Sequence, residues 1–267
     1  MPDTRKHRGP HPEDRALFAA GQLPALRSAI GDLNWLLTSG YADRSALKLV
    51  GDRYALHARQ RLAISRSACA ANVGLLRTQR RRAGDDLTGQ QLWIDGYNVI
   101  TSLEAALSGG VILHAQDGCY RDMASMHGSY RKVTETLPAI EILGNLLAQW
   151  NLSTCYWLLD QPVSNSGRLK RLLDDCAEKQ GWRWRVDLVR DPDAELIRCG
   201  QAVASADRRV IDGARCWLNL AREAIDSMVP SARIIDLCVS SRPDKALPPA
   251  RADHPHTVDR DDQAETR

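Results

Sequence analysis

Residues 91–100 read Gln91-Leu92-Trp93-Ile94-Asp95-Gly96-Tyr97-Asn98-Val99-Ile100. A short apolar run ends in Asp95, and Gly96 follows at once. This pattern is typical of a buried parallel strand that delivers a carboxylate to the carboxyl edge of a sheet, where open α/β folds bind ligands. Gly96 would permit a sharp turn there. An ordinary strand exit with a solvated aspartate gives the same local pattern, so acids elsewhere in the chain must decide between the two interpretations.

Strand-like segments alternate with amphipathic helices through residues 90–240. The expected strands are Leu92–Ile94, Cys155–Leu159, Trp184–Val189, Gln201–Ala204 and Ile234–Val239. The expected helices are Thr134–Trp150, Arg168–Lys179 and Asp207–Glu223. Such alternation is typical of βαβ units around a parallel sheet. Residues 101–133 interrupt the alternation with a polar loop, which we expect to be an insertion over the edge of the sheet.

The preceding part of the chain, residues 14–84, has helical periodicity and a basic charge. Residues 1–90 contain fifteen Lys and Arg against eight Asp and Glu, whereas the remainder contains twenty-one against twenty-five. This asymmetry indicates either a surface that docks a polyanion or a solvated helical surface. The helices are compatible with a helix-turn-helix or with a plain helical bundle. The charged run Arg77–Asp86 marks the expected domain boundary, and residues 1–13 and 241–267 are expected to be disordered.

Other features of the composition exclude several classes of protein. No run approaches the roughly 18 apolar residues that a membrane span requires. The polar first residues cannot form the apolar core of a secretory signal. The seven cysteines are scattered and include no Cys-x-x-Cys pair, which argues against a zinc site or a disulfide framework. We therefore expect a cytoplasmic protein with no membrane contact.

Acidic residues follow each of the next three expected strands. Asp160 ends the second, Asp193 follows the third, and Asp207 follows the fourth. Because the carboxyl ends of parallel strands meet at one edge, these carboxylates and Asp95 would repel one another unless a cation neutralised them. Oxygen ligands alone favour Mg²⁺ or Mn²⁺. Taken singly, Asp160 could be a turn residue, Asp193 a helix start and Asp207 a helix N-cap.

The segment Trp93–Ile100 closely resembles the first motif of the NYN branch of PIN-like nucleases, an apolar strand that ends in Asp-Gly-Tyr-Asn. Later matches come in the family's order, and the resemblance covers about residues 90–240. They are Leu158-Leu159-Asp160, Pro192-Asp193-Ala194-Glu195-Leu196 and Val203-Ala204-Ser205-Ala206-Asp207. The whole arrangement also resembles an uncharacterised prokaryotic family in which a helical N-terminal domain precedes a PIN-like domain. Pro192 stands where NYN relatives have Ala, and residues 101–133 are no part of the minimal pattern.

The resemblance implies an α/β fold, namely a PIN-like, three-layer domain with a central parallel sheet, preceded by a small all-α domain. It implies that Asp95, Asp160, Asp193 and Asp207 bind the metal and form the catalytic centre. It also implies that Asn98 holds the substrate or a ligand water. Arg131 heads the helix after the insertion and is a further candidate for phosphate contact, or a solvated helix-start residue.

The turn Ser164-Asn165-Ser166-Gly167 precedes a helix that starts at Arg168. Small residues at a helix N-terminus can form an anion site, so Ser164, Ser166 and Arg168 are candidates for binding a phosphate. An ordinary capped helix start explains the turn equally well.

The sequence thus predicts a ribonuclease that depends on Mg²⁺ or Mn²⁺, with RNA favoured over DNA as the partner. Two alternatives remain: a non-catalytic nucleic-acid-binding protein on a PIN-like scaffold, and a hydrolase of small phosphate compounds that uses the Ser164–Gly167 turn.

Overall fold

A computed structural model describes residues 7–124 and 130–239 of the chain. The expected disordered tail, residues 241–267, and the first six residues of the expected lead-in lie outside this range. Within it, no helix is both long and apolar enough to cross a bilayer. All seven cysteines are free thiols, and no disulfide joins any two of them.

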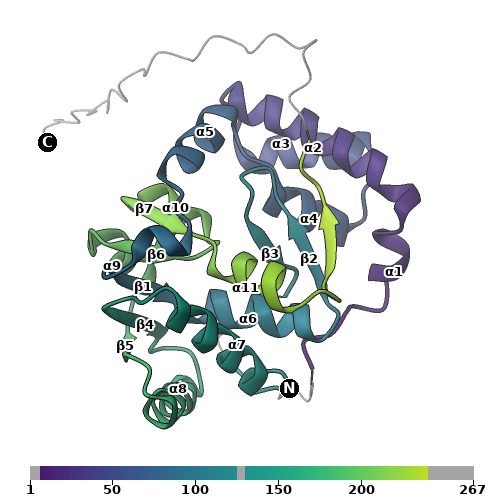
Figure 1. Ribbon diagram of the computed structural model, residues 1–267. Helices are drawn as coiled ribbons and strands as arrows, with labels where there is room; N and C mark the ends of the chain where they lie inside the picture. The colour runs from purple at the N-terminus through teal and green to yellow at the C-terminus, as the bar shows by residue number, and fades with distance from the viewer. Residues whose placement is uncertain (1–6, 125–129, 240–267) are drawn as a thin grey trace, which may run out of the picture.

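The centre of the molecule is a sheet of five parallel strands in the order β5-β4-β1-β6-β7 (Figure 1). Their bounds are β1 Gln91–Asp95, β4 Thr154–Asp160, β5 Trp184–Val189, β6 Ala202–Ala204 and β7 Cys216–Leu218. The chain adds strands on one side of β1 and then returns to the other side. The order therefore reverses between β1 and β6, the position at which open α/β sheets form a crevice for ligands.

Helices cover both faces of this sheet, so that the fold is an α/β arrangement in three layers. On one face Leu92 and Ile94 pack in a core with α6, α7, α8 and α11. On the other face Trp93 packs against a smaller core of α9 and α10. The bounds are α6 Gly96–Leu107, α7 Thr136–Gln149, α8 Ser166–Gln180, α9 Pro192–Arg198, α10 Arg208–Gly213 and α11 Leu220–Met228. Alternate strand residues thus serve opposite cores, as the period of two requires.

The helix after Asp95 explains the glycine in the first motif. Gly96 does not have a positive φ, so the expected sharp turn is not the reason for it. Instead, a Cβ at Gly96 would lie 2.6 Å from Leu159 Cδ2 and 3.0 Å from the Leu158 carbonyl oxygen of β4. Glycine is needed because α6 starts against the neighbouring strand.

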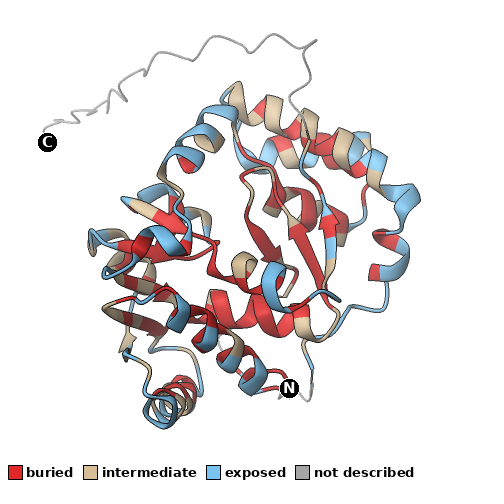
Figure 2. Ribbon diagram, in the orientation of Figure 1, coloured by how far each residue is buried: buried red, intermediate tan, exposed pale blue. Residues whose placement is uncertain are grey.

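The described residues of the segment 101–133, namely 101–124 and 130–133, do not form the expected polar insertion over the edge of the sheet. They complete α6 and then form β2 (Val111–His114) and β3 (Tyr120–Asp122) of a second sheet, ordered β3-β2-β8. Its third strand, β8 (Arg233–Asp236), corresponds to the expected strand Ile234–Val239, which therefore does not belong to the central sheet. Helix α6 contacts both sheets and is almost wholly buried between them (Figure 2).

The helical periodicity of the N-terminal part is confirmed. The helices are α1 Asp14–Leu17, α2 Leu23–Thr38, α3 Asp43–Arg53, α4 Ala58–Ser67 and α5 Ala71–Arg80, with 3-10 turns at Ala20–Gln22 and Gly84–Leu87. Helices α1 to α4 share one core with the second sheet, in which Ile30 and Ile64 pack with Leu113 and Leu237. Figure 1 shows α2 and α3 above β2 and β8, and α4 contacts β2.

Two charged segments are more ordered than the sequence suggests. Arg77, within the expected linker, is only 3% exposed and pairs with Asp117 and Asp212. Residues 7–13, assigned to the disordered lead-in, lie against the protein, where Arg8 pairs with the buried Glu104 of α6. Both arginines find carboxylates that are distant in the sequence.

The expected helix Asp207–Glu223 is wrong. This segment forms α10, the short strand β7 and α11 in succession. Its apolar residues have helical spacing, but Trp217 and Leu218 are buried in strand β7, which pairs with β6.

Candidate functional site

Asp95 lies at the carboxyl end of the central strand, beside the point where the strand order reverses. One carboxylate oxygen, Oδ1, accepts a hydrogen bond from the Asn98 backbone N–H at 3.3 Å and so caps α6. The other, Oδ2, accepts one from the Ser205 hydroxyl at 2.8 Å. The side chain is therefore held from both sides, by the helix that follows β1 and by the loop that follows β6.

The environment of Asp95 favours its protonated form in the absence of a cation. Burial raises the pKa of Asp95 to about 7, and the negative charges of Asp193 and Asp207 contribute to this rise. The hydrogen bonds from Ser205 and from the Asn98 N–H oppose it without cancelling it. A cation bound beside Asp95 would stabilise its ionised form and so lower this pKa.

The other predicted acids gather at the same edge of the sheet. Asp160 ends β4, Asp193 is the second residue of α9, and Asp207 caps α10 by accepting from the Arg209 N–H at 2.8 Å. Burial, then the charge of Asp193, raises the pKa of Asp160. Burial, then the charge of Asp207, raises the pKa of Asp193. Each acid is thus close enough to another to oppose its ionisation.

The single-residue explanations for these acids are also correct in part. Asp207 does cap a helix, and Asp193 does stand in the first turn of one. These local roles do not exclude a shared one, because the negative charges of Asp193 and Asp207 both act on Asp95. We call Asp95, Asp160, Asp193 and Asp207 the acid cluster.

Two side chains at the acid cluster were not assigned from the sequence. Ser205, 1% exposed, orients Asp95, as described above. Arg209 donates to Asp193 Oδ2 at 3.3 Å and to Asp191 Oδ2 at 3.5 Å, and it is a local countercharge. The small-residue run Val203–Asp207 indicated the loop, but no pattern indicated that Ser205 would be buried against Asp95 or that the exposed Arg209 would pair with Asp193.

The donor set determines which metal the acid cluster fits. Among the described residues, no group of three or more His, Cys, Asp or Glu side chains is placed so that it could hold a metal ion. In other proteins Mg²⁺ keeps several waters and is bound through one or two carboxylates. Carboxylate oxygens without a nearby His or Cys are ligands of the kind that Mg²⁺ and Mn²⁺ prefer and zinc does not.

Asn98 lies beside the acid cluster, but part of its side chain is engaged within the protein. Its Oδ1 accepts a hydrogen bond from the Ala206 N–H at 2.9 Å and so fixes the loop between β6 and α10. Asn98 thus positions the loop that carries Ser205 and Asp207.

The Ser164–Gly167 turn lies near the acid cluster but has internal partners. The Ser164 carbonyl oxygen accepts from the Tyr130 N–H at 3.1 Å, and the buried Ser166 hydroxyl donates to the Gln161 carbonyl oxygen at 3.4 Å. Tyr97 connects the two regions: burial, then the charge of Asp160, raises the pKa of its hydroxyl to about 12, and the Ser166 hydroxyl opposes this rise.

The basic candidates from the sequence lie outside this arrangement. Arg168, on α8, is exposed to solvent. Arg131 is also exposed, and its carbonyl oxygen accepts from Arg8 at 3.5 Å. No contact joins either guanidinium group to the acid cluster within the described residues.

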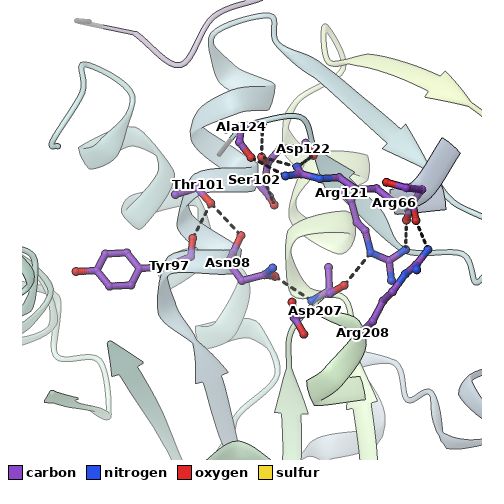
Figure 3. A pocket seen from close by; sticks show the side chains of 12 residues that line it. Arg66, Tyr97, Asn98, Thr101, Ser102, Arg121, Asp122, Ala124, Asp207 and Arg208 are labelled. Carbon is purple, nitrogen blue, oxygen red and sulfur yellow. Dashed lines mark hydrogen bonds and ion pairs between the residues drawn. The ribbon is translucent and has the colours of Figure 1, made fainter. Parts of the chain in front are cut away.

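A cavity of about 470 Å³ adjoins the acid cluster (Figure 3). Its walls come from α4, α6, β3 and the loop between β6 and α10. Asn98 and Asp207 belong to both the cavity and the acid-cluster region. The side chains most relevant to its chemistry are Arg66, Asn98, Thr101, Arg121, Asp207 and Arg208.

Arg121 holds the cavity wall next to Asp207 in place. It is 8% exposed, its Nε donates to the Ala206 carbonyl oxygen at 2.8 Å, and its Nη2 lies 2.7 Å from Asp117 Oδ2. Burial alone would raise the pKa of Asp117, but Arg121 and Arg77 outweigh it and hold that pKa well below its usual range. This buried pair therefore connects the second sheet to the loop of the acid cluster.

Comparisons with known proteins agree with the two-part organisation of the chain. Residues 25–80 match the family described as "Protein of unknown function (DUF434)". The chain is also 29% identical over 204 residues to the "Uncharacterized protein MJ0935" of Methanocaldococcus jannaschii, covering 76% of this chain and 97% of that relative. No solved structure is a significant match.

Residues 84–223 match the family described as "Domain of unknown function (DUF5616)". The match begins just before β1 and ends within α11, so it spans the central sheet and the acid cluster. Since this family model covers more than half of the chain, the protein belongs to the DUF5616 family.

Proposed function

We propose that this protein is a ribonuclease that depends on Mg²⁺ or Mn²⁺ and has a PIN-like fold of the NYN type. The observation that supports the proposal best is the electrostatic coupling of the acid cluster. Acids from β1, β4 and α9 each have a raised pKa, and each of them is opposed by another acid of the cluster. Acids are kept in such an arrangement at functional sites, where a cation makes their charges tolerable.

The position of the acid cluster also supports this function. It lies where the strand order reverses, as ligand sites do in open α/β sheets. Asp95, Asp160, Asp193 and Asp207 would hold the cation. A bound Mg²⁺ or Mn²⁺ supplies an acidified water and stabilises the charge that develops on a phosphodiester.

The chain itself contributes orientation and substrate binding. Ser205 and the Asn98 N–H hold Asp95 in one rotamer, while Asn98 fixes the loop of Asp207. Preorganised carboxylates avoid the cost of reorganising the site at each turnover. The arginines of the adjoining cavity provide positive charge for a polyanion, and the preference for RNA rests on the NYN resemblance.

Cleavage of a labelled RNA in Mn²⁺ by the wild-type protein and by Asp95→Asn tests the proposal. Asp95→Asn should lower the rate at least a hundredfold, since it removes a central ligand without removing a buried apolar group. The matched control is Asp187→Asn, an exposed acid in the middle of β5, which should cleave normally. RNA binding by the wild type without cleavage in Mn²⁺ would contradict the nuclease and support a non-catalytic RNA-binding protein. Turnover of a nucleotide but not of RNA would support a small-molecule hydrolase.

A further inference from the structure

Three arginines converge on the cavity beside the acid cluster. Arg66 comes from α4, Arg121 from β3 and Arg208 from α10. Figure 3 shows their side chains grouped on one side of the cavity, with Asn98 and Thr101 on the other. Because Asp207 and Asn98 also line this cavity, a molecule within it would adjoin the acid cluster.

The charge of one of these arginines is balanced inside the protein. Arg121 lies 2.7 Å from the buried carboxylate of Asp117, so its guanidinium group needs no further anion. Arg66 lies 3.8 Å from Asp122, beyond hydrogen-bond distance, and it donates only to neutral oxygens, the carbonyl oxygens of Asp122 and Ala124 at 2.5 Å and 3.0 Å.

Arg208 has no close carboxylate partner either. It donates to the carbonyl oxygens of Ser65 and Ala68, which are neutral, and its carboxylate neighbour Asp43 is 3.9 Å away on a side chain that is 80% exposed. An anion in the cavity would supply the countercharge that these neutral oxygens do not, so the position of Arg208 favours an anionic ligand.

The volume of the cavity restricts that ligand. About 470 Å³ falls in the range of sites for small organic molecules, and it is far more than a bare phosphate ion fills. The Thr101 and Ser102 hydroxyls of α6 also line the cavity; since they donate to the Tyr97 carbonyl oxygen and to Asp122, they can only accept hydrogen bonds from a ligand. A phosphate with its attached sugar and base suits this combination of charge, polar groups and size.

Building on the proposed nuclease function, we propose that this cavity binds one nucleotide of the substrate strand, next to the bond that is cleaved, with its phosphate on Arg208 and Arg66. The proposal assigns a role to the N-terminal helices. Helix α4 supplies Arg66 and, through the Ser65 and Ala68 carbonyl oxygens, holds the guanidinium group of Arg208. The helical segment is then one wall of the substrate site.

The test is binding of a short, fluorescently labelled single-stranded RNA in EDTA, where no cleavage occurs, over a series of salt concentrations. Arg208→Gln and Arg66→Gln should each weaken binding about tenfold. Each should also lower the slope of log Kd against log salt by about 0.7, the value for one lost phosphate contact with a single strand. Arg208→Lys should keep the slope, because it keeps the charge. Arg215→Gln is the matched control, since Arg215 is exposed at the amino end of β7, away from the cavity.

Thermal unfolding of each variant separates binding from folding, because Arg208 also holds α4. If Arg208→Gln is unstable, Arg66→Gln and Arg208→Lys decide. If a folded Arg208→Gln or Arg66→Gln protein keeps the wild-type affinity and salt slope, the cavity is not the nucleotide site. An equal loss of RNA affinity in Arg215→Gln would also contradict the proposal. Loss of cleavage in Asp95→Asn together with unchanged binding by the arginine variants would support the nuclease function and contradict only the nucleotide site in the cavity. Arginine-dependent RNA binding by a wild type that does not cleave RNA would support the nucleotide site and contradict the nuclease function.

Discussion

The Ser205 hydroxyl donates a hydrogen bond to Asp95 Oδ2 at 2.8 Å, so that the loop after β6 touches the end of β1. The Ser205 hydroxyl oxygen in turn accepts a hydrogen bond from the Asp207 N–H at 3.0 Å. One hydroxyl group therefore orients an acid that ends a strand and the backbone of an acid that starts a helix, across the reversal point of the sheet.

Ser205→Ala should raise the pKa of Asp95 further, because the hydrogen bond from Ser205 lowers it. The acid limb of the pH–rate profile for RNA cleavage should move to higher pH, and the rate at neutral pH should fall about tenfold, since hydrogen bonds to charged groups contribute about 1.5–3 kcal/mol. A carbon-13 NMR titration of Asp95 measures the shift directly. Ser45→Ala, at an exposed position on α3, is the control. An unchanged Asp95 titration in Ser205→Ala would mean that the hydroxyl does not govern this acid.

Asp95→Asn should stabilise the metal-free protein at pH 8. The pKa of Asp95 is about 7 in the folded protein, against 3.8 for an ordinary aspartate. Between these values the folded state binds more protons than the unfolded state, so its stability falls as pH rises through this range. The variant should gain on the order of 4 kcal/mol at pH 8 and less than about 1 kcal/mol at pH 4.

Urea unfolding in EDTA at the two pH values measures this difference. Addition of Mn²⁺ at pH 8 should stabilise the wild type more than Asp95→Asn, because a cation that binds the folded state adds to its stability. A parallel pH dependence in both proteins would show that Asp95 ionises normally.

Asp117→Asn should destabilise the protein by about 3–5 kcal/mol, because it leaves Arg77 and Arg121 buried without their shared carboxylate. Chemical denaturation at pH 7 measures the loss. Asp175→Asn, on the exposed surface of α8, removes the same charge and should have little effect. Equal stability of the two variants would mean that the buried pair contributes nothing.

Gly144→Ala should destabilise the fold by about 1–3 kcal/mol through overpacking. A Cβ at Gly144, on α7, would lie 2.0 Å from the Trp182 ring. Gly167→Ala, within α8, meets no atom within 4 Å and should be neutral or stabilising by up to about 1 kcal/mol, as alanine favours a helix. Denaturation midpoints of the two variants check the contrast, and a stable Gly144→Ala protein would place Trp182 elsewhere.

Much of the central sheet could be predicted because its strands are short apolar runs with clear ends. The strand Trp184–Val189 has the bounds that the sequence predicts, and the ends of β1 and β4 differ by one residue. The helix at residues 207–223 was wrong because its apolar residues satisfy helical spacing, whereas pairing with β6 requires Trp217 and Leu218 to be extended. Periodicity does not identify a strand's partner, so β8 was assigned to the wrong sheet.

The candidate site, too, could be predicted only in part. Strand ends in a parallel sheet share an edge by geometry, so the gathering of Asp95, Asp160, Asp193 and Asp207 could be anticipated. The roles of Arg121 and Arg208 could not, because each depends on contacts with residues more than fifty positions away. Local charge patterns made the basic half resemble a solvated surface, although Arg77 is buried and Arg8 and Arg59 are partly buried in ion pairs.

The core shared by the N-terminal helices and the second sheet has a consequence for how such a gene can change. Leu113, in the segment that matches the DUF5616 family, packs in one core with Ile30 and Ile64 of the segment that matches the DUF434 family. Recombination that transferred the segment with the acid cluster alone would expose the apolar face of the second sheet to water, and such a face is prone to self-association. The two segments should therefore be inherited together, with drift in one compensated in the other.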